Sequence, residues 1–232
     1  MGIKKQSASD VDPVWEGIYG DGRSLNRYPF DQVVSFLYRH YSRSKPRAET
    51  KVLEIGCGAG NNLWFAAREG FTVAGVDGSP SAIEYARERF NQDGLKGDFR
   101  VADFISLPFE SELFDFVIDR ASLTCSTFES AEKTVAEVQR VLVPNGKFFF
   151  NPYSDHDSSY VSGKPSPDGR TVDIQEGTKV GVGAIYFYSK RDVFRMFSKG
   201  WKLISLRHLA LVEELEPFYS CHAEWIAIVE KT

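Results

Sequence analysis

The sequence predicts an α/β fold in which a mostly parallel sheet is covered by helices on both faces. Between residues 51 and 150, short apolar runs alternate with amphipathic stretches at helical spacing, which is typical of parallel strands joined by crossover helices. Several of the apolar runs end in a polar residue, and the first one enters a glycine-rich turn. The last two apolar runs follow each other closely, so we expect them to pair antiparallel.

Seven short runs rich in aliphatic and aromatic residues are the expected strands. Their length and their bounding turn residues favour strands over helices. In chain order they are Val52–Ile55, Thr72–Val76, Phe99–Ala102, Phe114–Ile118, Lys147–Phe150, Leu203–Leu211 and Ala223–Glu230.

The expected helices follow from apolar spacing and from residues that begin or end a helix. Ser79 and Pro80 suit the N-cap and the first position of a helix, and Gly70 suits the end of one. Pro144-Asn145-Gly146 is expected to close a further helix. The predicted helices span 30–41, 61–69, 80–90, 131–142 and Asp192–Ser198.

Composition and charge exclude several classes of protein. The chain has 232 residues, 42% of them hydrophobic and 14% aromatic, which suits a single α/β domain with a buried core. The net charge of −4 argues against nucleic-acid binding, and no apolar run reaches the ~20 residues of a membrane span. The distant cysteines Cys57, Cys125 and Cys221 predict no metal site. We therefore expect a soluble cytoplasmic protein that binds neither nucleic acid nor membrane. Its oligomeric state stays open.

The turn after the first strand is expected to hold a nucleotide-like cofactor. Gly56, Gly58 and Gly60 alternate there before a helix begins, so a ligand can lie against bare main chain and unpaired helical N–H groups. A dinucleotide site would require glycine or alanine at Asn61. With Glu54 ahead of it, the pattern E-x-G-x-G-x-G resembles motif I of the class I S-adenosylmethionine (SAM) dependent methyltransferases.

That resemblance covers the chain from Lys51 to its C-terminus. It implies a Rossmann-like, seven-stranded, mostly parallel sheet with an antiparallel last strand, within a three-layer sandwich. It also implies SAM as cofactor and S-adenosylhomocysteine as product. The domain division that follows is an N-terminal helical cap over 1–50 and a SAM-binding methyltransferase domain over 51–232, with a substrate-side insertion at 152–188.

Acidic residues at strand ends are the next candidates for cofactor binding. Asp77 follows Gly56 by roughly 20 residues, the separation typical of an acid that binds ribose hydroxyls; its alternative role is turn formation. The resemblance places Asp103 and Phe104 at the adenine, although Asp103 could simply end a strand. By resemblance the cofactor site comprises Glu54, Gly56, Cys57, Gly58, Gly60, Asn61, Asn62, Asp77, Gly78, Ser79, Ala102, Asp103, Phe104, Asp119, Arg120, Ala121 and Leu123.

Two features near the expected substrate side allow more than one interpretation. Arg120 could bind a substrate acid or the SAM carboxylate, or it could pair with Asp119 or Glu54. Asn151-Pro152-Tyr153 is similar to the N-P-P-Y motif of amino-methyltransferases. However, it follows the fifth strand rather than the fourth and lacks the second proline. We therefore do not assign an amino acceptor, and keep Asn151 and Tyr153 as pocket candidates.

The polar segment from Pro152 to Tyr188 is expected to cap the substrate side, with a surface ornament as the alternative. Thr171–Ile174 and Ala184–Tyr188 could pair as a small hairpin within it. His156 lies beside Asp155 and Asp157, so it could act as a general base or be merely solvated. A metal at the two aspartates is weakly supported, and none is predicted. His40, His208 and His222 are expected to have structural roles only. The substrate candidates are Tyr28, Arg120, Asn151, Tyr153, His156 and Tyr160.

Three functions from different classes remain at this point. The first is a SAM-dependent methyltransferase acting on a small molecule, with a hydroxyl oxygen as the expected acceptor atom. The second is a SAM-binding protein or subunit that needs a partner for turnover. The third is an NAD-type oxidoreductase, which would require glycine at position 61 and a Tyr-x-x-x-Lys pair. Position 61 is asparagine, so the first requirement is not met.

Overall fold

The structure is a computed structural model and describes residues 13–215 and 220–232. The strands are β1 (Lys51–Ile55), β2 (Thr72–Asp77), β3 (Asp98–Val101), β4 (Phe114–Arg120), β5 (Leu142–Asn151), β6 (Lys164–Pro165), β7 (Thr171–Val172), β8 (Trp201–Glu213) and β9 (Ser220–Lys231). The helices are α1 (Val14–Gly20), α2 (Asp31–His40), α3 (Asn61–Arg68), α4 (Pro80–Gln92), α5 (Phe128–Val141), α6 (Ser158–Ser162) and α7 (Lys190–Met196).

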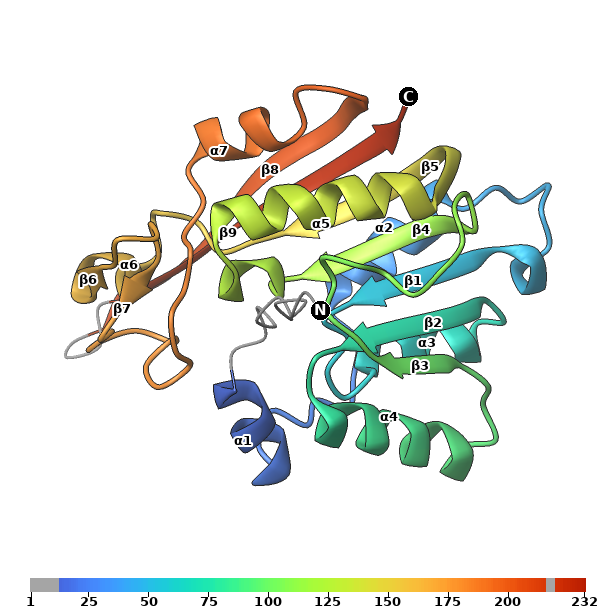
Figure 1. Cartoon of the computed structure of the whole chain (residues 1–232), viewed down its shortest axis with the longest axis horizontal. Helices are drawn as coiled ribbons and strands as arrows, with labels where there is room; N and C mark the ends of the chain where they lie inside the picture. The colour runs from blue at the N-terminus through green and yellow to red at the C-terminus, as the bar shows by residue number, and fades with distance from the viewer. Residues whose placement is uncertain (1–12, 216–219) are drawn as a thin grey trace, which may run out of the picture.

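Seven strands form one mixed sheet in the order β3-β2-β1-β4-β5-β9-β8 (Figure 1). Strands β1 to β5 pair in parallel, whereas β9 pairs antiparallel with both β5 and β8. The predicted fold class is thereby confirmed, including the antiparallel strand near the C-terminus. The order reverses at β1 and β4, which is where open α/β sheets bind ligands at the carboxyl ends of their strands.

The two faces of the sheet have separate apolar cores. Consecutive phenylalanines on β5 point to opposite faces, so Phe148 and Phe150 pack in one core and Phe149 in the other. The first core is covered by α5 and α7, and the second by α2, α3 and α4. In Figure 1, α5 lies in front of the sheet and α2 behind it. Burying each such ring contributes roughly 1.5–3 kcal/mol, so a charge at any of these positions would be strongly destabilising.

Helix boundaries agree with the capping signals in most places. Ser79 caps α4 as predicted, because its hydroxyl accepts a hydrogen bond from the backbone N–H of Ala82 at 3.1 Å. The helix expected to run to Leu142 ends at Val141 instead. Leu142 already pairs with Phe114, and the ladder shifts register immediately afterwards. The Pro-Asn-Gly turn therefore lies within β5 and does not close the helix.

The segment between β5 and α7 contains α6, β6 and β7. Thr171 and Ile185 exchange two backbone hydrogen bonds of 2.6 and 2.9 Å, so the two runs expected to pair do meet at one point. The ladder partner of β7 is nevertheless β6, which the sequence analysis did not predict. Ile185 also packs with Ile174 and Phe187 in a small apolar cluster of its own. We refer to residues 152–188 as the cap.

Within residues 13–215 and 220–232, no helix combines the length and apolar character needed to cross a membrane. The same residues contain no group of three or more His, Cys, Asp or Glu side chains placed to hold a metal ion.

Candidate functional site

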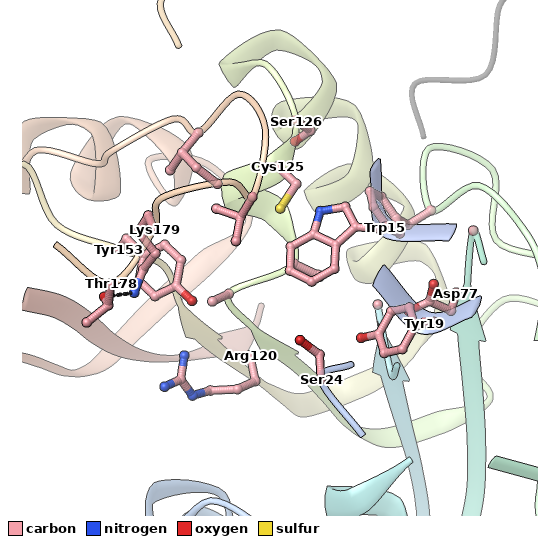
Figure 2. A pocket seen from close by; sticks show the side chains of 17 residues that line it. Trp15, Tyr19, Ser24, Asp77, Arg120, Cys125, Ser126, Tyr153, Thr178 and Lys179 are labelled. Atoms are coloured by element: carbon pink, nitrogen blue, oxygen red, sulfur yellow. Dashed lines mark hydrogen bonds between the residues drawn. The ribbon is translucent and has the colours of Figure 1, made fainter. Parts of the chain in front are cut away.

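A cavity of about 290 Å³ opens at the carboxyl ends of β1, β2 and β4. It is lined by α1 and the segment that follows it, by the loops after β1, β2, β3 and β4, and by the cap (Figure 2). Asp77 and Tyr19 lie at one end of the cavity, whereas Arg120, Tyr153 and Lys179 lie at the other. We call these the Asp77 end and the Arg120 end.

The glycine loop has a backbone that other residues would not tolerate. Gly56, Gly58 and Gly60 have φ values of +61°, +49° and +71°, in the left-handed region that favours glycine. A Cβ on Gly56 would lie 2.1 Å from the Cβ of Ser122, and one on Gly58 would lie 2.3 Å from the hydroxyl of Tyr19. Gly56 lines the cavity. The loop thus presents bare main chain to a ligand.

Asp77 joins the glycine loop to the start of α4. Its Oδ2 atom accepts a hydrogen bond from the N–H of Gly58 at 2.8 Å, and its Oδ1 atom accepts one from Ser79 at 2.9 Å. Burial raises the pKa of this carboxyl, and the backbone donors oppose that shift. Because the side chain also lines the cavity, its remaining lone pairs can accept from a vicinal diol.

Three polar residues of the predicted cofactor set lie behind the cavity wall. Asn62 donates to Glu54 at 2.6 Å, and its Oδ1 atom accepts from the N–H of Phe30 at 3.0 Å. Asn61 donates to the carbonyl of Tyr28 at 2.9 Å. Burial raises the pKa of Glu54 to about 8. These residues fix the N-terminal segment onto α3 and shape the site from outside.

Asp119 likewise supports the site without lining it. Its Oδ1 atom accepts hydrogen bonds from the N–H groups of Ser122 and Leu123 at 2.9 and 3.1 Å, and burial raises its pKa to about 6. The turn that it holds gives Ala121 a φ of +61°. Ala121 and Ser122 then line the cavity, whereas Leu123 is buried in the core.

At the adenine side of the expected site, the loop after β3 contributes one residue to the cavity. Phe104 lines the cavity, as does Gly78 after β2. Ala102 donates its N–H to the carbonyl of Asp77 at 3.0 Å, and Asp103 accepts from the N–H of Ile105 at 3.1 Å. The carboxyl of Asp103 therefore caps its own turn.

Arg120 pairs with a residue that the sequence analysis did not consider. Its Nη2 atom lies 3.0 Å from the Oε2 atom of Glu224 on β9, and its guanidinium covers the ring of Phe30 at 4.3 Å. The alternatives in which it pairs with Asp119 or Glu54 are wrong, because the side chain extends across β5 toward β9. Arg120 still lines the cavity, so it can contact a ligand.

Lys179 of the cap was not predicted as a site residue. It is 6% exposed and lines the cavity. Its Nζ atom lies 2.5 Å from the hydroxyl of Thr178, 3.3 Å from Nδ1 of His222 and 3.9 Å from the ring centre of Tyr153. Burial lowers the pKa of Lys179 to about 8. The only sequence signal was a lysine within a glycine-rich loop, which usually indicates solvent exposure.

His222, expected to be structural, takes part in the same network. It lies 3.3 Å from Asp157 and 3.5 Å from Glu224, and hydrogen bonds to these two carboxylates raise its pKa. Glu224 thus links the histidine to Arg120. The network draws on β4, β9 and the cap, which are distant in sequence.

Four of the predicted substrate residues do not line the cavity. The buried amide of Asn151 donates to the carbonyl of Trp225 at 2.7 Å, joining β5 to β9. Tyr28 is 76% exposed, and Tyr160 packs against Phe187 within the cap. The side chain of His156 is 68% exposed, so it stands outside this cavity. Tyr153 does line it.

The first helix supplies two further cavity residues. Trp15 and Tyr19 lie four residues apart on one face of α1, and both line the cavity. Burial strongly raises the pKa of Tyr19, so its hydroxyl stays protonated. The spacing was visible in the sequence. The spacing alone does not show whether Trp15 and Tyr19 pack in the core or line a site, because that depends on where α1 docks.

Part of this chain is similar in sequence to known methyltransferases. Residues 52–146 match the family model described as methyltransferase domain. Methyltransferase GfsG of Streptomyces halstedii is 34% identical over 110 residues, covering 46% of this chain and 39% of that protein. Fatty-acid O-methyltransferase of Mycolicibacterium smegmatis is 32% identical over 143 residues, covering 61% of this chain and 49% of that protein.

Solved structures show the same fold over a longer stretch. A SAM-dependent methyltransferase from Methanosarcina mazei superposes with a TM-score of 0.68 at 20% identity, covering 84% of this chain and 96% of that one. The matches to the curated relatives span less than half of those proteins' length.

Proposed function

Because this chain belongs to the class I SAM-dependent methyltransferases, we propose that it methylates a hydroxyl oxygen of a small-molecule acceptor. The observation that carries the proposal is a single cavity that joins the glycine loop and Asp77 to the cap. A cofactor and an acceptor can therefore meet in one cavity. The name of the fatty-acid O-methyltransferase supports oxygen as the acceptor atom.

The residues at the Asp77 end fit the cofactor. Asp77 would bind the ribose hydroxyls, and the main chain at Gly56 would accommodate close approach. Phe104 would contact the adenine, and Trp15 and Tyr19 of α1 would cover the nucleoside. When bound, SAM supplies an activated methyl group on its sulfonium. The reaction converts the acceptor hydroxyl to a methyl ether, with release of the hydroxyl proton and of S-adenosylhomocysteine.

The protein's own contribution is to align the acceptor and to exclude water. Holding two reactants in line can lower a barrier by roughly 7–11 kcal/mol. Charge is neutralised as the methyl group moves from a sulfonium, so a dry cavity favours the reaction. Val182 and Ile185 of the cap give the acceptor region apolar walls. His156 is not assigned as a base, because it stands outside the cavity.

Titration calorimetry with S-adenosylhomocysteine tests the cofactor half of this proposal, with NADH as the control. We expect micromolar binding of S-adenosylhomocysteine and none of NADH. Binding of NADH alone would contradict the proposal. The acceptor half is tested by incubating the enzyme with methyl-labelled SAM and hydroxylated small molecules, and locating the label on oxygen by mass spectrometry. Label on nitrogen or carbon would refute the oxygen assignment.

A further inference from the structure

The Arg120 end of the cavity carries positive charge on its surface and negative charge behind it. Among the described residues that line the cavity, the charged side chains are Asp77 at one end and Arg120 and Lys179 at the other. The carboxylates of Asp157 and Glu224 are nearby, but their side chains are only 1% and 2% exposed and do not line the cavity. A ligand in this region therefore meets two cations.

The buried carboxylates are already engaged by other partners. Glu224 contacts Arg120 and His222, and Asp157 contacts His222 and the N–H of Ala223. In the described part of the chain, the close polar contacts of the Lys179 ammonium are a hydroxyl, an imidazole and an aromatic face, and none is a carboxylate. Its charge is thus left without a direct counter-ion.

The two cations also act on each other. Burial is the main cause of the lowered pKa of Lys179; attraction to the Asp157 and Glu224 carboxylates opposes the shift, and repulsion from Arg120 adds to it. With a pKa of about 8, Lys179 is still mostly protonated at pH 7. Two like charges that line one cavity are stabilised by an anion bound between them. The Nε atom of Arg120 has no hydrogen-bond partner among the described residues, so the guanidinium has not used all of its donors.

We propose that the methyl acceptor is a small organic acid whose carboxylate binds between Lys179 and Arg120. This inference rests on the proposed methyl transfer and names the class of acceptor. The alternative ligand for these cations is the carboxylate of the cofactor itself. Strand order argues against it: Arg120 reaches across β5 to Glu224 on β9, and Lys179 packs on Tyr153 after β5. Lys179 thus lies on the β5 side of the cavity, away from β1 and β2, where the glycine loop lies.

The carboxylate is the anchor of this acceptor and not the atom that is methylated. Methylation would convert it to a neutral ester and weaken both ion pairs as the reaction proceeds. A catalyst gains only from interactions that strengthen in the transition state. The acceptor is therefore a hydroxy acid with its nucleophilic oxygen separate from the carboxylate. The apolar side chains of Val182 and Ile185 suit the carbon skeleton between the two groups.

The test measures binding of acids and their uncharged amides by titration calorimetry in saturating S-adenosylhomocysteine. The probes are acetate, benzoate and 4-hydroxybenzoate, each paired with its amide. We expect at least one acid to bind roughly tenfold or more tightly than its amide, from the strength of charge-assisted hydrogen bonds. Lys179→Met should abolish that preference, because methionine keeps the apolar stem and removes the charge. Lys164→Met is the matched control, since Lys164 is an exposed cap lysine paired with Asp173.

Each other outcome decides against the inference or against the proposed function on which it rests. If no acid binds more tightly than its amide, or if the preference survives Lys179→Met in a variant that keeps its melting temperature, the carboxylate site is wrong. If Lys179→Met weakens S-adenosylhomocysteine instead, Lys179 belongs to the cofactor site. The cofactor titration on the same samples separates the two proposals. Unchanged cofactor binding with failed acid binding refutes only the acceptor class. Selective acid binding without any cofactor binding would refute the proposed function and leave the anion site standing.

Discussion

Asp77 combines a structural role with the ligand-binding role that we propose for it. Two backbone N–H groups from different loops fix its position, and the same side chain faces the cavity. A side chain held in this way binds a ligand without first losing rotamer freedom, which favours affinity. The placement of Asp77 near the glycine loop could be predicted from the sequence, because its separation from Gly56 follows from the local strand-turn-helix geometry.

We predict that Asp77→Ala weakens binding of S-adenosylhomocysteine by roughly 10- to 100-fold, which corresponds to the loss of charge-assisted hydrogen bonds. Titration calorimetry measures the change. Asp98→Ala is the control, because Asp98 is an exposed carboxylate on β3 that pairs with Arg100. Equal affinity in the Asp77 variant and the wild type would show that our placement of the cofactor is wrong.

Glu54 predicts a pH dependence of stability. Its folded-state pKa is about 8 and its ordinary value is 4.5, so the folded chain keeps the proton over a range in which the unfolded chain has lost it. The unfolded state then binds fewer protons, and the free energy of unfolding falls as pH rises from 4.5 to 8. Asp119, with a pKa of about 6, adds to the decline with the same sign.

Glu54→Gln should therefore flatten the decline of melting temperature between pH 5 and pH 8, measured without ligand. Glutamine retains an oxygen that can accept from Asn62, but it has no proton to lose. A smaller slope should persist because Asp119 remains. If the melting temperatures of wild type and variant decline in parallel between pH 5 and pH 8, Glu54 does not cause the pH dependence. Asp115→Asn is a useful comparison, since Asp115 is a partly exposed carboxylate paired with Lys45.

Most residues at the Arg120 end could not be predicted from the sequence. Lys179, His222 and Glu224 carry no motif, and they are brought together only by the path of the cap over β9. Arg120 could be identified as a candidate from its strand end. Its partner could not, because the ion pair joins strands that are two positions apart in the sheet.

At the scale of elements, α1 is held against the start of α4 and the glycine loop by specific contacts. Glu16 accepts hydrogen bonds from the hydroxyls of Ser79 and Ser81 at the start of α4. These bonds lower the pKa of Glu16, so the tether is present at neutral pH. Tyr19 of the same helix lies directly over Gly58. Docking of α1 and formation of the cavity wall are thus coupled.

Glu16→Ala should loosen α1 and reduce affinity for S-adenosylhomocysteine by roughly fivefold, the effect of about one hydrogen bond to a charged group in a solvent-accessible place. Cleavage near α1 in limited proteolysis should become faster, and saturating ligand should slow it again. Asp21→Ala removes an exposed ion pair with Arg23 just after α1. It should change neither the affinity for S-adenosylhomocysteine nor the rate of cleavage. Full affinity in the Glu16 variant would indicate that α1 does not cover the cofactor.

The elements that the sequence predicted are those with a strong local pattern. The seven strands of the main sheet and the helices between them follow from apolar periodicity and caps. The short strands β6 and β7 do not, because two-residue strands have no periodicity to detect. The seven-residue α1 was likewise not predicted as a helix, since its stability comes from docking rather than from its own length.

The whole molecule offers the most direct test of the cofactor assignment. A ligand that binds only the folded state raises the free energy of unfolding by about 2.7 kcal/mol at 100 times its dissociation constant. For a chain of this size each kcal/mol raises the melting temperature by roughly 2–4 °C. Here the proposed ligand would contact β1, β2, β4 and α1 together, so its binding stabilises the sheet and the N-terminal segment as one unit.

We therefore expect S-adenosylhomocysteine at 100 times its dissociation constant to raise the melting temperature by roughly 5–10 °C. NADH should leave it unchanged. The shift should shrink in Asp77→Ala at the same ligand concentration, because affinity falls, and should recover when the concentration is raised in proportion.

A shift with NADH but not with S-adenosylhomocysteine would contradict the assignment. A shift that Asp77→Ala leaves intact would place the ligand elsewhere in the molecule. Recovery at higher concentration separates weakened binding from a damaged fold, since a misfolded variant would not respond to ligand at any concentration.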